Sequence, residues 1–300
     1  MAGKIRVMTM LGGIAIGDPL GGAERLGADI ARRLDRDRFE PSICALWRYD
    51  TPAERAWLAL LAAEGIPVLF AAPATRKHPL SFAAALQSIA RQSTSRQVDI
   101  LHSYLPLSAL AAALLKRRLG ASALVRTAAA GREWGDGPTS FLARQLLTNW
   151  VYPLIFDQEA CVSRDIQARF DRRPGARLAG KRIVFTPSAI DLARYRPRDS
   201  REEARRELGL PGDALVVGSV GRLSQEKGFG DLLDAAALVR QQFSGVTFAH
   251  FGNGPLRAEL ESRAVELGLA DGFRFFGART DLPDLYGAMD LLVLPSHWEG

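Results

Sequence analysis

The sequence contains little cysteine and no long hydrophobic run. Only Cys44 and Cys161 occur among the 300 residues, and they do not form a CxxC pair, so we interpret both as small buried hydrophobic residues and expect no disulfide framework. The longest apolar run, residues 105–115, is shorter than the ~20 residues that a transmembrane helix requires. Residues 1–11 also lack the apolar core of a signal peptide. We therefore expect a cytoplasmic protein without a membrane-spanning segment.

Positive charge exceeds negative charge, and the excess is concentrated in one segment. The formal net charge is +6 and the pI is near 9.7. Residues 164–182 contain seven cations and two carboxylates, which leaves +5. Two interpretations stay open: a solvated arginine-rich surface, or a face that meets anionic lipid or a phosphorylated acceptor. A nucleic-acid partner is not expected, because this segment has little aromatic interleaving and no nucleic-acid motif.

Hydrophobic patterning predicts an α/β fold in which strands and helices alternate. This alternation is typical of a doubly wound parallel sheet, and the length favours two domains: residues 1–193 and 202–300, joined by a charged, proline-containing linker at 194–201. The strands are expected at residues 4–11, 41–47, 66–70, 98–101, 122–127, 160–162, 183–185, 214–220, 247–251, 273–276 and 290–294. The longer helices are expected at residues 23–34, 52–64, 80–91, 107–119, 141–156, 231–243 and 256–267, and shorter ones at 163–170, 202–208 and 281–289.

One stretch combines a buried strand with an anion-binding loop. Residues 214–220 are apolar and end at Gly221, and Arg222 and Lys227 follow before an amphipathic helix. Ligands of open α/β sheets bind beyond the carboxyl ends of the strands, where helix amino termini favour negative charge. Arginine supplies a fixed fork for phosphate oxygens, and lysine supplies a point charge. A phosphate site and a pair of solvated surface cations are both compatible with the sequence here.

Three motifs in one register carry a family resemblance. They are GRLSQEKG at residues 221–228, HFGNGP at 250–255 and FRFFGARTDLPDLYGAMDLLVLPSHWEG at 273–300. In this order they resemble the nucleotide-binding half of the retaining glycosyltransferases of family 4, strongly from residue 208 onward and more loosely before residue 187. The resemblance implies a GT-B architecture, with two Rossmann-like domains facing a cleft and the second domain incomplete.

The resemblance assigns donor-side roles to residues of the second domain. Arg222 and Lys227 would stabilise the departing diphosphate, and Glu299 would bind the donor sugar or offset positive charge on its ring. Glu299 also matches the first member of the family's paired glutamates, so the second would lie beyond the last residue and a truncated chain is expected. No metal or cofactor is expected, because the leaving phosphate itself takes the acceptor's proton in the family's usual account. The remaining expected donor contacts are Gly221, Gly252, Asn253, Ala278, Arg279 and Gly300.

The first domain offers weaker matches. Gly21, Gly22 and Glu24 match a GGxE element that faces the donor diphosphate in the family, although glycine is common in turns and Glu24 also suits the first turn of a helix. His102 ends a predicted strand, and a single histidine is more often structural. The sequence departs from the family after residue 127, where RTAAAGREW lacks the usual histidine. The expected acceptor-side residues are His102, Arg126 and Arg132, with Glu133 beside them.

Two further features bear on partners. The aromatic residues Trp150 and Tyr152 on the helix predicted at residues 141–156 are interpreted as core or interface, with a membrane contact as the second alternative. Residues 188 and 189 are Ser and Ala where the family usually has Asn and Gly. The loop therefore lacks the two residue types that adopt the left-handed conformation most readily.

The resemblance implies a retaining transferase of the hexosyl type that acts in polysaccharide biosynthesis. It would move a sugar from a UDP- or GDP-sugar to a glycan or lipid-linked acceptor. A protein that binds nucleotide sugars without catalysis, or an inactive fragment, is the alternative. A nicotinamide-dependent oxidoreductase is disfavoured because no G-x-G-x-x-G follows the first strand.

Overall fold

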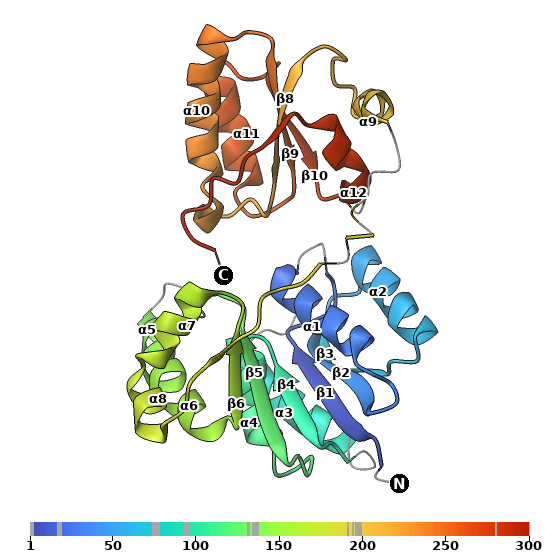
Figure 1. The fold of residues 1–300 in the computed structure, drawn as a ribbon, viewed down its shortest axis with the longest axis vertical. Helices are drawn as coiled ribbons and strands as arrows, with labels where there is room; N and C mark the ends of the chain where they lie inside the picture. Colours follow the sequence, from blue (N-terminus) through green and yellow to red (C-terminus); the bar gives the residue numbers. More distant parts are fainter. Residues whose placement is uncertain are drawn as a thin grey trace. The chain divides into compact units, whose positions relative to one another are not determined.

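The computed structural model describes residues 3–16, 20–73, 79–92, 97–130, 133, 138–190, 192–193, 195, 200–279 and 281–299. The chain divides into two compact units, Met1–Ser188 and Ala189–Glu299, and each is an α/β unit built on a parallel sheet (Figure 1). Most of the predicted linker lies outside the described residues, and the first helix of the second unit begins at Arg201. Within the described ranges, no helix combines the length and apolarity needed to cross a bilayer.

The first unit contains a seven-stranded parallel sheet in the order β3-β2-β1-β4-β5-β6-β7. The order reverses between β1 and β4, and ligands of such sheets bind at this kind of switch point. The doubly wound parallel sheet predicted from the sequence is confirmed. The strands are β1 (Ile5–Leu11), β2 (Phe39–Arg48), β3 (Val68–Pro73), β4 (Ile100–Ser103), β5 (Ala123–Ala128), β6 (Gln158–Cys161) and β7 (Val184–Phe185).

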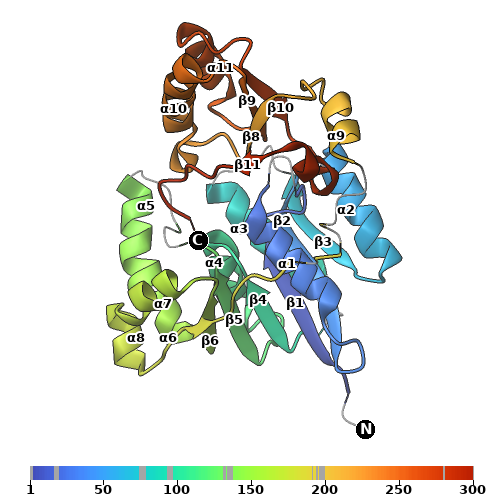
Figure 2. The ribbon, with the colours of Figure 1, turned by 45° about the horizontal axis from the view of Figure 1, so that its top comes forward.

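Helices cover both faces of this sheet, because successive strand side chains point to opposite sides. In β2, Cys44 and Leu46 join the core under α3 and α4, whereas Ile43 and Ala45 join the core under α1 and α2 (Figure 2). Both cysteines are free and buried, as expected, and burial raises the pKa of the Cys44 thiol to about 12. The helices are α1 (Gly22–Arg33), α2 (Pro52–Ala63), α3 (Pro79–Gln92), α4 (Pro106–Leu115), α5 (Pro138–Ala143), α6 (Tyr152–Ile155), α7 (Arg164–Asp171) and α8 (Pro174–Ala179).

Two helical regions differ from the prediction. The single helix expected at residues 141–156 consists of α5, a π-helical segment at Arg144–Val151 and α6. Helix α8 was not predicted: it begins at Pro174 and ends after one and a half turns at Gly180, whose φ of 62° suits a glycine cap. By contrast, Ser163 caps α7 as predicted, because its hydroxyl accepts a hydrogen bond from the Ile166 amide at 3.3 Å.

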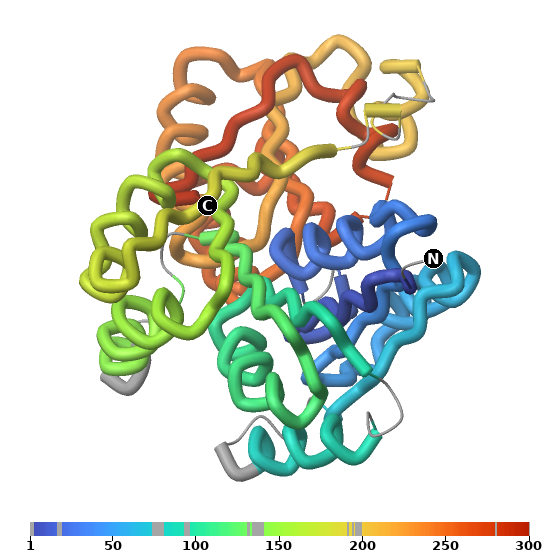
Figure 3. The backbone as a smooth tube through the Cα atoms, turned by 60° about the horizontal axis from the view of Figure 1, so that its bottom comes forward, coloured from blue at the N-terminus to red at the C-terminus, as the bar shows by residue number. Residues whose placement is uncertain are grey.

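The second unit contains a four-stranded parallel sheet in the order β10-β9-β8-β11. Its strands are β8 (Leu215–Val220), β9 (Val246–Phe251), β10 (Phe273–Gly277) and β11 (Leu291–Leu292), the last shorter than predicted. Helices α10 (Phe229–Gln242) and α11 (Arg257–Glu266) pack on one face, and α9 (Arg201–Glu207) and α12 (Leu282–Leu285) pack on the other. Figure 3 follows the backbone through both units.

Candidate functional site

The carboxyl ends of β8, β9 and β10 are tied together by backbone contacts at glycines. The Gly221 amide donates to the Phe251 carbonyl at 3.0 Å, and the Gly252 amide donates to the Gly277 carbonyl at 2.8 Å. A β-carbon at Gly252 would overlap the carbonyl oxygen of Gly221, and φ there is 154°. Gly252, a predicted donor contact, is therefore required at least by the close approach of two loops, whereas a β-carbon at Gly221, the other predicted contact, would lie 3.1 Å from the Phe229 ring.

Arg222 is held by its neighbour, while its own side chain is exposed. Leu223 is fully buried, its amide donates to the Asn253 carbonyl at 3.0 Å, and its carbonyl accepts from the Leu256 amide at 3.1 Å. No hydrogen bond or ion pair joins the Arg222 guanidinium to another residue that the structure describes. A cation anchored through its backbone and open at its head is suited to bind an anion.

Lys227 and Glu299 lie together although 72 residues separate them. The lysine Nζ donates to Glu299 Oε1 at 2.6 Å, and the Ser296 hydroxyl donates to the same oxygen at 2.6 Å. Burial raises the pKa of the Glu299 carboxyl, but the hydrogen bonds from Lys227 and Ser296 outweigh it and lower that pKa overall. Glu299 is therefore ionised at neutral pH and neutralises part of the charge of Lys227.

The segment that carries Glu299 is fixed against the Lys227 loop. The His297 amide donates to the Glu226 carbonyl at 2.9 Å. Gly228 has a φ of 63°, and a β-carbon there would overlap the Pro295 carbonyl oxygen. The structure thus brings the predicted pair Lys227 and Glu299 into one site through contacts that sequence reasoning missed, at Ser296 and His297. The only signal for these two residues was their position directly after a predicted strand.

The other predicted donor contacts of the second unit lie at the same edge of the sheet. The Asn253 side chain accepts from the Gly254 amide at 3.0 Å, and Ala278 is exposed. Arg279 binds the carboxylates of Asp281 and Glu207, which raise its pKa further above its usual value. Its guanidinium is therefore occupied, and a nucleotide contact in this loop would depend on the backbone. Gly300 lies outside the described residues.

His250 is a buried neighbour of these loops that the sequence did not single out. Its Nδ1 lies 3.0 Å from the Ser219 hydroxyl, and its Nε2 has no hydrogen-bond partner among the described residues. Burial lowers the pKa of His250 to about 4, and the nearby Arg257 charge contributes. The imidazole is therefore neutral at physiological pH.

In the first unit, Gly21 and Gly22 begin helix α1 at an exposed position. Gly21 is the N-cap residue and supplies no side-chain hydrogen bond. A β-carbon at either glycine would meet no atom within 4 Å, so packing of the described residues does not require glycine here. Glu24 lies in the first turn of α1, as expected, and is buried.

His102 lies at the carboxyl end of β4, within a small hydrogen-bonded cluster. Its Nε2 is 2.9 Å from the Thr127 hydroxyl, and its Nδ1 is 3.2 Å from the Tyr104 hydroxyl. Burial lowers the pKa of His102 to about 4. Both ring nitrogens are engaged and the ring is neutral, so His102 can hold a hydrogen-bond geometry but not supply a positive charge.

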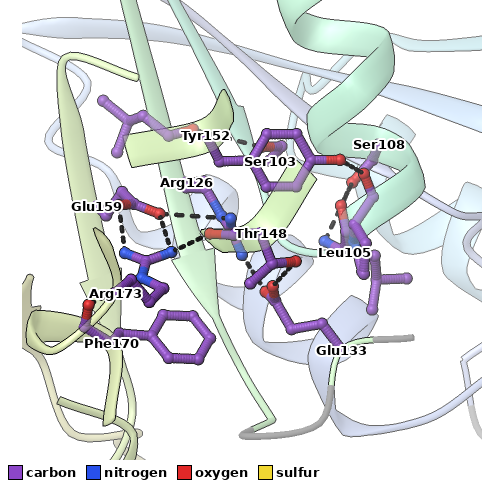
Figure 4. Close-up of polar contacts among 12 residues, drawn as sticks. Ser103, Leu105, Ser108, Arg126, Glu133, Thr148, Tyr152, Glu159, Phe170 and Arg173 are labelled. Carbon is purple, nitrogen blue, oxygen red and sulfur yellow. Dashed lines mark hydrogen bonds and ion pairs between the residues drawn. The ribbon is translucent and has the colours of Figure 1, made fainter. Parts of the chain in front are cut away.

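Arg126 lies inside a buried network of charges (Figure 4). Its guanidinium binds the Glu133 carboxylate and lies 3.3 Å from Glu159 Oε1, and Arg173 holds Glu159 from the other side at 2.5 Å. Thr148 completes the network by donating to Glu133 at 3.1 Å. Arg126 is 2% exposed, and this burial argues against direct contact with an acceptor. Arg132, the other predicted cation of this loop, lies outside the described residues.

Sequence reasoning missed Glu159 because it began the strand one residue later. Glu159 pairs in register with Arg126 on the neighbouring strand. A glutamate and an arginine inside adjacent buried strands were the available signal. A buried charge requires a partner, since desolvation otherwise destabilises it.

No group of three or more potential metal ligands occurs among the residues that the structure describes. The expectation that neither metal nor cofactor is needed stays a prediction.

Comparison with known proteins places the chain in a family. Residues 20–194, more than half of the chain, match the model "Glycosyltransferase Family 4", and residues 200–300 match "Glycosyl transferases group 1". The chain is 37% identical over 116 residues to the lipopolysaccharide core biosynthesis mannosyltransferase LpsB of Rhizobium meliloti, which covers 37% of this chain and 33% of that protein. It is 30% identical over 249 residues to a D-inositol 3-phosphate glycosyltransferase of Salinispora arenicola, and this match covers 74% of this chain and 54% of that protein. The chain thus spans about a third to a half of the length of these relatives.

Solved structures identify the fold. The crystal structure of Anabaena Alr3699/HepE in complex with UDP and glucose matches with a TM-score of 0.73 and 23% identity, over 97% of this chain and 74% of that one. Sucrose-phosphate synthase from Thermosynechococcus elongatus matches with a TM-score of 0.74 and 15% identity, over 99% of this chain and 76% of that one. The two α/β units are those of a GT-B fold, in which the second unit is the shorter one here. With its family model covering more than half of the sequence, this chain belongs to glycosyltransferase family 4.

Proposed function

We propose that this protein transfers a sugar from a nucleotide-diphosphate donor, a UDP- or GDP-sugar, to a glycan or lipid-linked acceptor, with retention at the anomeric carbon. The observation that carries the proposal is the loop after β8, where Arg222 is exposed and Lys227 pairs with Glu299 on backbone shaped by glycine. Membership of family 4 supports it, as do the UDP and glucose bound by Alr3699/HepE and the sugar-transfer names of the relatives.

The chemistry divides between charges that the site already contains. The bond between the anomeric carbon and the diphosphate oxygen breaks, and the electron pair stays on the diphosphate. Arg222 and Lys227 stabilise that developing negative charge. The acceptor oxygen then bonds to the anomeric carbon on the same face, and its proton passes to the leaving phosphate oxygen. Glu299 binds the donor sugar or offsets positive charge on its ring.

The first unit binds the acceptor in this proposal. The neutral His102 cluster supplies hydrogen bonds at the carboxyl end of β4, and the Arg126 network fixes Glu133 in the loop that follows β5. Arg126 therefore acts as a positioning residue and not as an acceptor ligand. The protein works in the cytoplasm, in polysaccharide biosynthesis, with peripheral contact to an anionic membrane.

A second candidate function is nucleotide-sugar binding without transfer. Lys227 is already paired with Glu299, and the loop after β5 lacks the histidine that many family members have there. These two features favour binding over catalysis, because the charge available to a leaving group is reduced.

Release of nucleoside diphosphate tests both candidates. Purified protein is incubated with UDP- or GDP-sugars and with a glycan or lipid extract, and Arg222→Ala is compared with Arg206→Ala, an exposed arginine on α9. We expect turnover to fall about 100-fold in Arg222→Ala, the cost of losing one preorganised donor to a developing charge, and to be unchanged in Arg206→Ala. Near-normal turnover of Arg222→Ala would remove the site assignment. Calorimetric binding of UDP or GDP without any release would favour the second candidate.

A further inference from the structure

The helical stretch from α5 to α6 exposes an unusual amount of apolar surface. Six large apolar side chains on it have exposed fractions of 38–66%, whereas Tyr152 and Phe156 on its other side are buried. The exposed residues are Phe141, Leu142, Leu146, Trp150, Leu154 and Ile155. Of the two aromatic residues that the sequence placed in a core or interface, Tyr152 is buried and Trp150 is not. Large apolar side chains exposed along one stretch are typical of an interaction surface.

The π-helical segment keeps these side chains on one face. Leu142, Leu146, Trp150 and Leu154 are spaced four residues apart. A step of four residues overshoots a turn of an α-helix, which has 3.6 residues, and falls short of a turn of a π-helix, in which hydrogen bonds join residues five apart. Because the stretch passes from α to π and back to α, the two drifts oppose one another and the stripe stays straight.

The basic segment at residues 164–182 packs against the same helical stretch. Helix α8 packs against the π-helical segment so closely that a β-carbon at Gly175 would lie 2.7 Å from the Trp150 carbonyl oxygen. Lys181 donates to the Phe156 carbonyl at 2.7 Å, which ties the basic segment to the end of α6. Figures 1 and 2 both show α5, α6, α7 and α8 gathered on one side of the first sheet.

The bordering cations are available for an external partner. The guanidinium groups of Arg172, Arg177 and Arg182 are exposed, and no ion pair or hydrogen bond joins them to another described residue. Between residues 138 and 156 the sequence contains no acidic residue. The face therefore combines apolar side chains, including an interfacial tryptophan, with positive charge that nothing on the same stretch offsets.

We infer that this face, formed by the exposed residues of α5 to α6 with Arg172, Arg177 and Arg182 beside it, binds the surface of an anionic lipid bilayer. Charge complementarity favours lipid as the partner. A second copy of the chain would bring the same cations against one another, whereas anionic headgroups complement them. The apolar stripe would lie at the boundary of headgroups and acyl chains. The inference assigns residues to the proposed membrane contact but does not depend on sugar transfer, since binding needs neither donor nor acceptor.

Vesicle flotation tests this inference on the 300-residue chain. We expect the protein to float with phosphatidylcholine vesicles that contain phosphatidylglycerol, and to float weakly with phosphatidylcholine alone or at high salt. The double variant Leu146→Glu and Trp150→Glu should bind at least about 10-fold more weakly, because two apolar contacts are lost and two negative charges are added. Arg172→Ala, Arg177→Ala and Arg182→Ala together should weaken binding by about 100-fold and flatten its salt dependence.

A matched control uses the second unit. Leu238 and Phe243 on and after α10 are each 62% exposed, so Leu238→Glu and Phe243→Glu introduce the same chemistry at a comparable exposure and should leave flotation unchanged. Equal binding of the Leu146 and Trp150 double variant, or equal loss in the control, would overturn the assignment. The assignment would also be overturned if the parent protein did not bind vesicles but formed a dimer in sedimentation velocity, and if the double variant were a monomer. A second copy of the chain would then cover this face.

Discussion

The two units differ in how they hold the arginines that the sequence offers as site residues or their neighbours. In the first unit, Arg126 and Arg173 are buried and share the carboxylate of Glu159. In the second unit, Arg222 is exposed without a described partner, and the carboxylate that binds Lys227 is itself half exposed. A buried cation must be neutralised within the protein, because it loses its hydration on burial and only a nearby carboxylate can compensate for that loss. An arginine in or just after a strand therefore indicates ligand binding only when its guanidinium stays accessible.

Removing one charge from the buried network should give the largest effect. Arg126→Met leaves Glu133 and Glu159 buried, with the cation between them gone, and we expect the free energy of unfolding to fall by about 3–5 kcal/mol. Arg222→Met should change it by less than about 0.5 kcal/mol, because an exposed side chain without partners is replaced. Urea unfolding of both variants makes the measurement. Similar losses in the two proteins would contradict the contrast between the units.

Histidine titration should test the two units separately, since one buried, neutral imidazole is found among the described residues of each. The pKa of His102 and of His250 is lowered to about 4 from 6.5. Between those values the unfolded chain binds a proton that the folded chain does not, so stability is complete above pH 6.5 and falls as pH decreases toward 4. Each histidine accounts for about 3 kcal/mol of that loss.

Substitution of one histidine separates the two contributions. His250→Asn keeps an acceptor for the Ser219 hydroxyl, and it should remove the acid sensitivity of the second unit while that of the first unit stays. Thermal unfolding between pH 7 and pH 4.5 is the readout, with His102→Asn as the reciprocal variant. If both variants kept the full acid sensitivity of the parent protein, other groups would be responsible for it.

The exposed ion pair of Lys227 and Glu299 should contribute little to stability. Glu299→Gln should lower the free energy of unfolding by less than about 1 kcal/mol, because a solvent-exposed ion pair contributes little. It should nevertheless tighten UDP or GDP binding several-fold in calorimetry, since Lys227 is released toward phosphate, and should slow sugar transfer. Glu261→Gln breaks an ion pair of similar exposure with Arg257 on α11 and should change stability equally and binding not at all. Unchanged nucleotide affinity in Glu299→Gln would separate this pair from the donor site.

The order of strands and helices could be predicted from the sequence, but the details of the polar contacts could not. The strand and loop around Gly221 were evident from an apolar run that stops at glycine, and Ser163 was recognised as a helix cap. Helix α8 escaped prediction because six residues hold too little periodicity to stand out. The π-helical segment was predicted as ordinary α-helix, since a long apolar stretch does not distinguish the two.

The set of helices and strands and their alternation can be derived from the sequence, because apolar periodicity and turn residues act within a few residues of one another. Which charges are neutralised and which remain available depends on the folded chain. Arg173 meets Glu159 across 14 residues and Lys227 meets Glu299 across 72, and such partners are brought together by the register of strands and the approach of glycine loops. The physical reason is that burial and pairing of charge depend on neighbours in space, whereas the sequence displays only neighbours along the chain.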